Sequence, residues 1–256
     1  MNENIYIHNI ENIQDLLGQL DHIKAELGFE KIWFRGVADT AYGLEPSIFR
    51  RAVNPAIEKD LYNKFKVRAL PFLDQEPNDN YWEWLFYMQH YGVPTRLLDW
   101  SESALIGLAF SVIFREEKHQ DKDAALWCLD PIKLNRDFVK GFKPTEILPN
   151  ITDPTVQGVQ KYSDPEIPVD YPVAVYGPQN NERIVAQKGV FTLFPFKERL
   201  KLEDLPTSHN FLAKIIIRNA EIDRIKSQLI TLGITETLVY PGLDYLADEI
   251  KREVFN

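Results

Sequence analysis

The sequence has almost no cysteine, and this excludes two ways of stabilising a fold. Cys128 is the only cysteine among the 256 residues, so an intrachain disulfide and a cysteine-based zinc site are both excluded. The preceding residues 124–127 are mostly apolar, which predicts that Cys128 is a buried strand residue. The chain must therefore fold around an ordinary hydrophobic core, for which its composition is suitable.

Long hydrophobic runs and a surplus of basic residues are also absent. No run of about 18 apolar residues is present, which argues against a membrane span. The N-terminus has no basic stretch followed by an apolar segment, so no signal peptide is expected. The 38 acidic and 29 basic residues give a net charge of −9, which disfavours general binding to nucleic acids or anionic membranes. We therefore expect a cytoplasmic protein, and this charge still allows a small basic pocket for a phosphate-bearing ligand.

Common metal and catalytic motifs are missing as well. The five histidines are scattered without a paired ligand at helical spacing, so no metal site is predicted. The sequence contains no Walker loop, no dinucleotide glycine fingerprint and no nucleophile elbow. No resident cofactor is predicted, and a functional site must be assembled from polar residues of distant segments.

Helical and strand patterns follow one another without regular alternation. Helices are expected at 10–27, 54–73, 79–91, 220–232 and 243–255, and another begins at Ser101 with Asp99 or Ser101 as its N-cap. Strands are expected at 31–36, 124–129, 173–176, 190–194, 211–217 and 237–240, with helical turns at 181–188. Residues 142–172 are expected to form a long irregular excursion. This pattern predicts one α+β domain over residues 1–256, with a central mixed or antiparallel sheet flanked by helices.

The stretch from Gln89 to Trp100 is the densest cluster of polar and aromatic residues. A turn is predicted at 91–94, after an aromatic helix, and its proline forces the preceding residue into an extended conformation. Arg96 and Asp99 would then lie near the start of the next helix, where the helix dipole favours an anion. This stretch is therefore expected to form part of a binding site.

Individual residues of this stretch have both functional and structural interpretations. His90 is a candidate base, and the alternative is a hydrogen-bonded core histidine. Asp99 is a candidate catalytic carboxylate, and the alternative is that it caps the following helix. Tyr91, Thr95 and Trp100 are candidate ligand contacts, of which the two aromatic rings would stack on a base.

Arginine also occurs in an apolar strand near the N-terminus. Alternation along Trp33-Phe34-Arg35-Gly36 puts Arg35 on the same face as Trp33. A guanidinium beside bulky rings needs a carboxylate or a ligand phosphate as its partner, and a structural ion pair is the alternative. Gly36 allows a sharp turn or the close approach of a ligand to the backbone.

Two further segments supply candidate ligand-binding residues. The segment 44–51 contains a hydroxyl and cations, of which Ser47 and Arg50 are candidates. On the short helix at 181–188, Arg183 and Gln187 share a face at four-residue spacing, and Glu182 is a candidate catalytic carboxylate. A structural or surface role is the alternative for both segments.

The chain resembles the FRG domain family, which is named for the Phe-Arg-Gly triplet found here at 34–36. The resemblance extends through 44–50, 89–100, 187–191 and 233–243, and it covers most of residues 5–250. It implies that Arg35, Arg96, Asp99 and Gln187 are defining positions. The family is widespread in bacteria and phages, so the resemblance implies a bacterial or phage protein with a role in phage defence or stress signalling.

The triplet is also similar to the first motif strand of arginine-type ADP-ribosyltransferases, whose arginine holds the NAD phosphates. This similarity implies an enzyme that acts on NAD or another nucleotide by glycosyl transfer or cleavage. Arg35 and Arg96 would hold phosphates, and a carboxylate such as Glu182 would stabilise positive charge in the transition state. The Ser-Thr-Ser strand and the Glu-x-Glu motif of those enzymes are not found in this sequence.

Two alternatives to an enzyme stay open. The first is a non-catalytic module that binds a nucleotide-like small molecule or a partner protein. The second is a buried ion-pair network in which Arg35, Arg96 and Asp99 tie three segments together.

Overall fold

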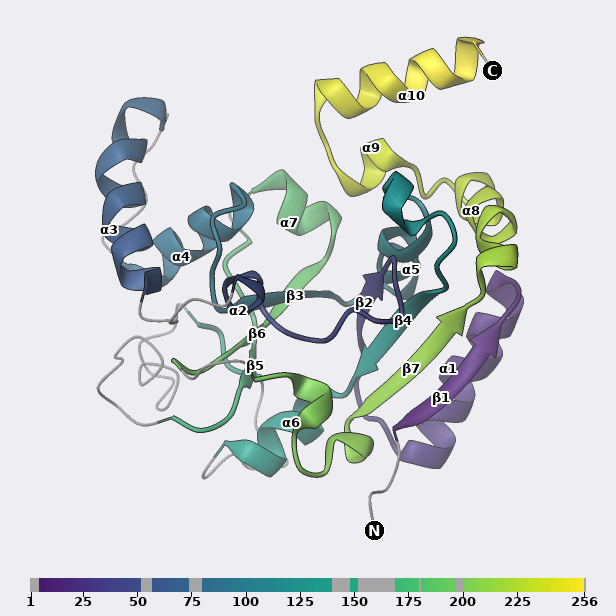
Figure 1. Ribbon diagram of the computed structural model, residues 1–256, viewed down its shortest axis with the longest axis horizontal. Coiled ribbons are helices and arrows are strands. Elements are labelled where there is room, and N and C mark those ends of the chain that lie inside the picture. The colour runs from purple at the N-terminus through teal and green to yellow at the C-terminus, as the bar shows by residue number, and fades with distance from the viewer. Residues whose placement is uncertain are drawn as a thin grey trace.

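The computed structural model describes residues 5–51, 57–73, 80–139, 148–151, 169–179, 181–196 and 200–255 (Figure 1). Most of the excursion expected at 142–172 lies outside these residues. Within them, a seven-stranded sheet has the order β1-β7-β4-β2-β3-β6-β5. None of the described helices is long and apolar enough to cross a membrane.

The strands form a mixed sheet. Only β1 and β7 pair in parallel, and every other neighbouring pair is antiparallel. The predicted α+β fold with a mixed, mainly antiparallel sheet is thus confirmed. The strands are β1 Tyr6–Ile10, β2 Trp33–Val37, β3 Leu97–Ser101, β4 Ala124–Leu129, β5 Val173–Val175, β6 Gly189–Leu193 and β7 Leu212–Ile217.

Helices cover both faces of this sheet and extend beyond it (Figure 1). The α-helices are α1 Ile13–Leu27, α2 Ser47–Arg50, α3 Ile57–Ala69, α4 Tyr81–His90, α5 Ala104–Val112, α6 Pro131–Phe138, α7 Glu182–Ala186, α8 Ile222–Thr231, α9 Glu236–Val239 and α10 Leu243–Phe255. The short 3-10 helices are η1 Leu70–Phe72, η2 Glu117–His119, η4 Leu202–Asp204, η5 Ser208–Asn210 and η6 Asn219–Glu221.

The structure differs from the expectations at the starts of two helices, α9 and α5. The strand expected at 237–240 is the helix α9, because the Thr235 side chain accepts a hydrogen bond from the backbone N–H of Leu238 and caps it. The N-cap of α5 is Ser103, since Asp99 and Ser101 belong to strand β3. Capping by either residue was therefore a wrong expectation, and Asp99 keeps its carboxylate for other contacts.

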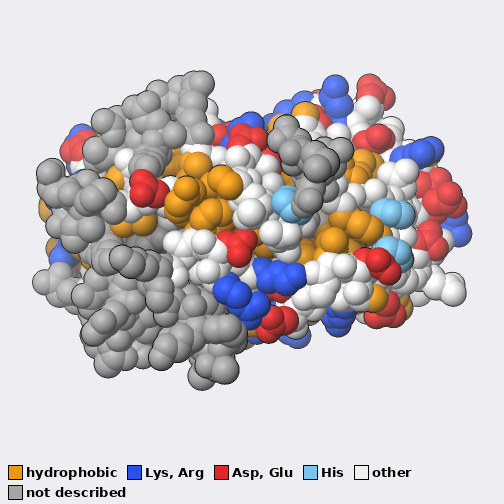
Figure 2. All heavy atoms as spheres, turned by 90° about the horizontal axis from the view of Figure 1, so that it is seen from below, with side chains coloured by type: hydrophobic (Ala, Val, Ile, Leu, Met, Phe, Trp, Pro, Cys, Tyr) orange, Lys and Arg blue, Asp and Glu red, His pale blue; other side chains and the backbone are white. Residues whose placement is uncertain are grey.

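The alternation of β2 supplies side chains to two cores. Phe34 packs in the core that includes the buried residues of α1, α5 and α8, whereas Trp33 and Val37 pack in the core that includes α2 and α6. Cys128 is buried in β4, as expected. On the face seen in Figure 2, the Lys and Arg side chains drawn lie among Asp and Glu side chains and form no continuous basic surface.

The sheet opens between its two central strands. β2 pairs with β4 from Trp33 to Val37, whereas its antiparallel pairing with β3 is restricted to Phe34 and Ser101. No other residue pair of these two strands is hydrogen-bonded in ladder register in the described chain. The polar residues next to this pair therefore border a gap in the sheet, which we call the seam.

Candidate functional site

A cleft of two adjoining chambers lies beside the seam. The larger, which we call the Arg35 chamber, has a volume of about 300 Å³, at the lower end of the range of ligand pockets. The smaller, the His90 chamber, has about 50 Å³. The two chambers adjoin, because they share the lining residues Asp99, Trp100, Arg183 and Gln187. The Arg35 chamber is completed by Phe34, Arg35, Gly36, Ser101, Phe110, Phe114 and Tyr240, and the His90 chamber by Phe86, Gln89, His90, Ile184, Gly189 and Phe191.

Arg35 is a partly buried cation near Asp99, and it forms no ion pair within 4 Å with a carboxylate of the described residues. Its Nη1 donates a hydrogen bond of 2.7 Å to the backbone carbonyl of Asp99, and its buried Nε has no partner. This is the one hydrogen bond of the guanidinium among the residues that the structure describes. Burial lowers the pKa of Arg35 to about 10, and the group is still charged at neutral pH. Because Arg35 lines the larger chamber, its Nη groups are the donors that could meet an anion there.

The Asp99 carboxylate is exposed and faces both chambers. Its Oδ2 accepts a hydrogen bond of 2.9 Å from Nε2 of Gln89, and the Oε1 of Gln89 accepts one from the Thr95 hydroxyl. This chain of bonds fixes the orientation of the carboxylate from the end of α4. Asp99 is consequently a positioned negative charge in the cleft.

His90 lies partly buried in the smaller chamber. Burial, with a smaller effect of the nearby Arg183 cation, lowers the pKa of His90 below its usual value. The imidazole is therefore neutral at pH 7 and able to accept a proton. No described side chain is recorded as a hydrogen-bond partner of His90.

Helix α7 contributes the second cation of the cleft and connects it to the C-terminal segment. The Arg183 guanidinium lies over the ring of Tyr240, 4.4 Å from its centroid, and Nη2 donates to the Tyr240 hydroxyl at 3.3 Å. Nε2 of Gln187 donates to the backbone carbonyl of Val239 at 3.0 Å, and the carbonyl of Gln187 accepts from the Ser101 hydroxyl at 2.7 Å. The residues after α9 are thus one wall of the cleft.

The same wall is aromatic. The Tyr240 ring meets those of Phe114 and Phe110 edge-to-face, with centroids 4.9 and 5.9 Å apart. Burial raises the pKa of the Tyr240 hydroxyl, so it is protonated over the physiological range. An apolar or aromatic part of a ligand would find its contacts here.

Gly36 is explained by packing between β2 and α5. A Cβ atom at this position would lie 2.0 Å from the carbonyl oxygen of Gly107 and 2.6 Å from the backbone nitrogen of Ser111. Gly107 in turn has no room for a Cβ, which would lie 2.7 Å from the Cβ of Phe34. The two glycines let helix and strand approach closely, and this approach forms the floor of the cleft.

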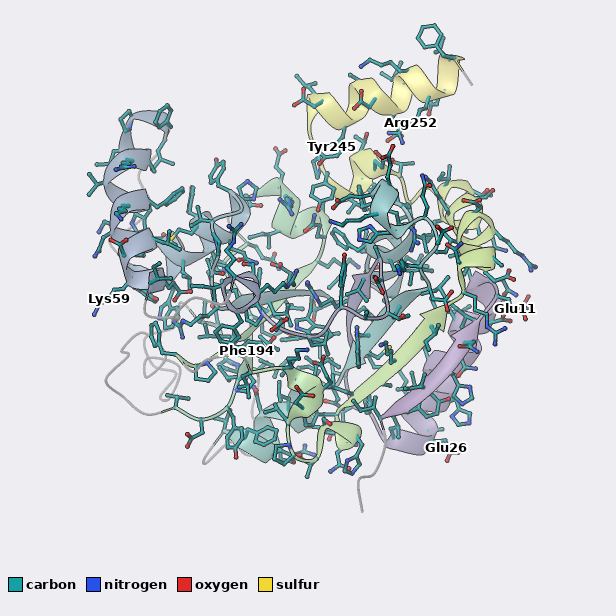
Figure 3. The ribbon with its side chains drawn as sticks, in the orientation of Figure 1. Glu11, Glu26, Lys59, Phe194, Tyr245 and Arg252 are labelled. Atoms are coloured by element: carbon teal, nitrogen blue, oxygen red, sulfur yellow. The ribbon has the colours of Figure 1, made fainter. Side chains whose placement is uncertain are left out.

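Arg96 lies outside the cleft, and its guanidinium is paired with protein groups. Its side chain and that of Glu58 have no solvent-exposed surface, and Nε lies 2.7 Å from Oε2 of Glu58. Nη1 donates to the carbonyl of Phe194 at 2.6 Å, and the backbone N–H donates to Oε1 of Glu58 at 2.6 Å. Phe194 lies in the interior of the molecule (Figure 3). Arg96 therefore fixes the start of α3 to the sheet, and the alternative of a buried network joining it to Arg35 and Asp99 is not formed.

The other candidate residues divide clearly between the cleft and the rest of the molecule. The ring of Trp100 lines both chambers, while its buried indole N–H donates to Thr192 Oγ1 at 3.1 Å. Thr95 is buried behind Gln89, and Tyr91 lines a separate apolar cavity next to α3. Three further candidates also lie outside both chambers. Glu182 is exposed, and Ser47 lies at the start of α2. Arg50 is exposed and donates a hydrogen bond to the Glu45 carbonyl.

Several lining residues were not among the sequence candidates. Gln89 was inside the dense stretch, but its role depends on the position of Asp99, which lies ten residues later in β3. Tyr240 carried a signal, because it lies in the segment 233–243 that contributes to the family resemblance. Phe110 and Phe114 gave no signal beyond an apolar helix. No group of three or more metal-ligating side chains occurs in the described part of the chain.

Comparison with curated proteins and with solved structures gave no match. A family model described as FRG domain matches residues 30–122. This segment runs from β2 to α5 and η2, and it includes Arg35, His90 and Asp99, whereas Arg183 and Gln187 lie beyond it. The protein thus contains an FRG domain, matched over residues 30–122.

Proposed function

We propose that the cleft binds a phosphate-bearing small molecule of the nucleotide class, with Arg35 as the main anion-binding group. The state of Arg35 carries this proposal. A desolvated guanidinium is normally paired with a carboxylate, and its planar fork of donors matches a phosphate equally well. In the described structure Arg35 has one carbonyl partner and an unpaired Nε.

The composition of the cleft supports the same ligand class. Arg35 and Arg183 place two positive charges against the single carboxylate of Asp99, in a chain whose net charge is −9. The aromatic wall formed by Phe110, Phe114 and Tyr240 offers ring faces and edges to a base. The cleft therefore offers cations for a phosphate and aromatic rings for a base.

Calorimetric titration and thermal unfolding with NAD, ADP and inorganic phosphate test this proposal. A ligand that binds the native state raises the unfolding temperature, and we expect NAD or ADP to do so. Arg35→Ala should weaken binding by about tenfold or more, since a charge-assisted hydrogen bond contributes about 1.5–3 kcal/mol. The matched control is Arg218→Ala, which removes an exposed arginine outside both chambers and should leave binding unchanged. Equal effects of the two substitutions would contradict the proposal.

A second candidate function is cleavage of NAD or transfer of its ADP-ribosyl group. It is supported by the Asp99 carboxylate, which lies in both chambers and is held by Gln89. In such a step the bond from ribose C1 to the nicotinamide nitrogen breaks, and its electron pair leaves with nicotinamide. Water or another acceptor hydroxyl adds to C1 and releases its proton, for which neutral His90 is a candidate acceptor. Asp99 would stabilise the positive charge at C1 in the transition state.

Release of nicotinamide from NAD, measured by chromatography, separates the two candidates. Turnover by the wild-type protein that is lost in Asp99→Asn would support the enzyme. Binding of NAD without turnover would support a non-catalytic module. A cytoplasmic location and a role in phage defence or stress signalling stay predictions from the sequence.

A further inference from the structure

Helix α10 is attached to the rest of the molecule through its polar side. Tyr245, Glu249 and Arg252 are spaced four and three residues apart, so they share one face. The Tyr245 ring stacks on Tyr240 at 5.0 Å, and Oε2 of Glu249 accepts a hydrogen bond from the backbone N–H of Thr237. Arg252 forms an ion pair with Glu236 from α9, and the labelled Tyr245 and Arg252 side chains lie on the α9 side of the helix (Figure 3).

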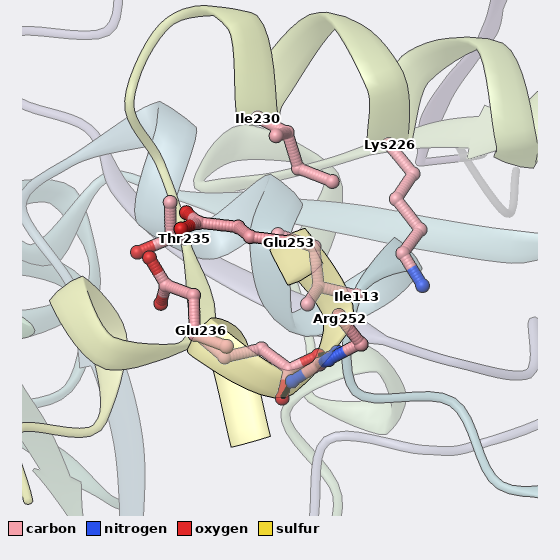
Figure 4. A pocket seen from close by; sticks show the side chains of 8 residues that line it. Ile113, Lys226, Ile230, Thr235, Glu236, Arg252 and Glu253 are labelled. Carbon is pink, nitrogen blue, oxygen red and sulfur yellow. Dashed lines mark hydrogen bonds and ion pairs between the residues drawn. The ribbon is translucent and has the colours of Figure 1, made fainter. Parts of the chain in front are cut away.

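The opposite face of α10 is apolar and uncovered. It consists of Leu243, Leu246, Ile250 and Val254, which are 83%, 41%, 49% and 68% exposed. No residue of α10 is buried, and a cavity of about 220 Å³ lies between α8, α9 and α10 (Figure 4); its surface is mainly apolar, although most of its lining residues are charged or polar. A helix of this length is marginal by itself, and it is normally stabilised by packing of its apolar face. The exposed stripe therefore indicates a binding surface.

An apolar surface flanked by basic residues lies on α3. Leu61, Phe65, Phe72 and Tyr91 line an open apolar cavity of about 500 Å³, with Lys64 and Arg68 at its rim. We call this surface the α3 groove. Phe72 and Tyr91 are among its exposed large side chains, although neither contributes to the cleft. An amphipathic helix with acidic flanks is the kind of occupant that such a groove accepts.

The charges of the two helices are opposite. Helix α10 carries four acidic and two basic residues, and both of its basic side chains are already in ion pairs with acidic ones. Helix α3 carries four basic and two acidic residues; of the acidic ones, Glu58 is buried against Arg96 and Asp60 pairs with Lys64. Glu253 lies three residues after Ile250 of the apolar stripe and also lines the cavity between α8, α9 and α10, and Arg68 lines the α3 groove.

The positions of α3 and α10 show whether the two helices can meet within one copy of the chain or only between two copies. Both helices project from the same side of the molecule, and α7 lies between them (Figure 1). Within one copy, α10 contacts α9 and not α3. A twofold axis passing between the two helices would place each α10 opposite the α3 groove of the other copy, and such a reciprocal contact closes on itself.

We propose that the protein forms a twofold-symmetric dimer in which the apolar stripe of α10 of each copy binds in the α3 groove of its partner. The dimer buries both apolar surfaces at once and brings opposite charges together. It is independent of the ligand proposed for the cleft. The interface also has two equivalent contacts, so a substitution on either helix weakens both.

Light scattering coupled to size-exclusion chromatography, over a range of protein concentrations, tests this dimer. We expect a dimer whose dissociation constant rises by about tenfold or more in Ile250→Glu and in Phe72→Glu, because each introduces a charge into an apolar contact. The matched control Val67→Glu changes an exposed apolar residue of α3 outside the groove and should leave the dimer intact. Circular dichroism checks that each variant is folded.

A charge exchange distinguishes the proposed contact from other dimers. Arg68→Glu and Glu253→Arg should each weaken the dimer, and the combined variant should recover most of the lost affinity. A wild-type protein that is monomeric at every concentration would overturn the proposal. A dimer that is lost in Ile250→Glu but unaffected by Phe72→Glu and Arg68→Glu would overturn it too, since α10 would then pair with itself.

Discussion

Two arginines of the same family segment have opposite surroundings. The side chains of Arg96 and its partner Glu58 have no exposed surface. Arg96 also donates a hydrogen bond to the Phe194 carbonyl. Arg35 borders the cleft with one carbonyl partner and an unpaired Nε. Both positions were expected to hold phosphates, and only Arg35 lines the cleft.

The comparison shows what distinguishes a structural cation from a binding cation. A guanidinium enclosed with a carboxylate contributes to stability, because removal of either partner leaves an unpaired buried charge. A guanidinium held by a single carbonyl contributes little to stability and keeps donors for a ligand. Substitutions at the two sites should therefore affect different measurements.

The largest effect is expected from breaking the closed pair. Arg96→Ala and Glu58→Ala should each lower the free energy of unfolding by about 3–5 kcal/mol, because each leaves a buried charge without its partner. Urea denaturation measures this loss. The combined Arg96→Met, Glu58→Leu variant should recover part of it, since both charges are then absent. A loss below about 1 kcal/mol in both single variants would show that the pair is not closed.

A somewhat smaller loss is expected from the floor of the cleft. Gly36→Ala places a Cβ atom 2.0 Å from the Gly107 carbonyl oxygen, and the required shift of α5 should cost about 1–3 kcal/mol. The control is Gly18→Ala in α1, where a Cβ atom meets nothing within 4 Å and should stabilise by about 0.5–1 kcal/mol. Thermal unfolding of the two variants should therefore change in opposite directions.

Substitution of Arg35 should have almost no effect on stability. Arg35→Ala removes a desolvated cation that has no carboxylate partner, so the free energy of unfolding should change by less than about 1 kcal/mol or rise. Urea denaturation of the ligand-free protein measures it. A loss comparable to that in Arg96→Ala would assign Arg35 a structural role and remove the basis of the proposed anion site.

The smallest expected effect concerns His90 and pH. Because the pKa of His90 is lowered in the folded state, the unfolded chain binds a proton at a higher pH than the folded protein does. Stability is unaffected above the unfolded pKa and is lost as pH falls from about 6.5 towards the lower folded pKa. His90→Gln should therefore lose less stability than the wild type between pH 7 and pH 5, as measured by urea denaturation. An identical pH dependence would contradict the lowered pKa.

Elements with long, consistent patterns were predicted correctly from the sequence. The helix expected at 243–255 and the strand expected at 124–129 have the predicted bounds. Short elements such as α2 and α9 contain too few residues for a periodic pattern, and α9 was expected as a strand for that reason. Its start depends on one capping hydroxyl, Thr235, which a pattern of apolar residues does not show.

The site was predicted only in part, because partners across the sheet are not visible in a sequence. Arg35, Arg96, Asp99 and Gln187 were chosen as a group, and the structure brings all of them except Arg96 to one cleft. The partner of Arg96 lies 38 residues earlier, at Glu58 on an otherwise exposed helix. Nothing in the local sequence distinguishes that carboxylate from its neighbours. Which arginine is enclosed and which is open is decided by tertiary packing.

The seam between β2 and β3 makes the sheet mechanically uneven. Strands β1, β7, β4 and β2 form one half, strands β3, β6 and β5 form the other, and the pair Phe34–Ser101 joins them together with the hydrogen bond from Arg35 to the Asp99 carbonyl. Arg35 belongs to the first half, whereas Arg183 and Gln187 precede β6 in the second. A ligand held by Arg35 and Arg183 together would act as a cross-link between the halves. Binding of such a ligand would then reduce the motion of one half of the sheet relative to the other.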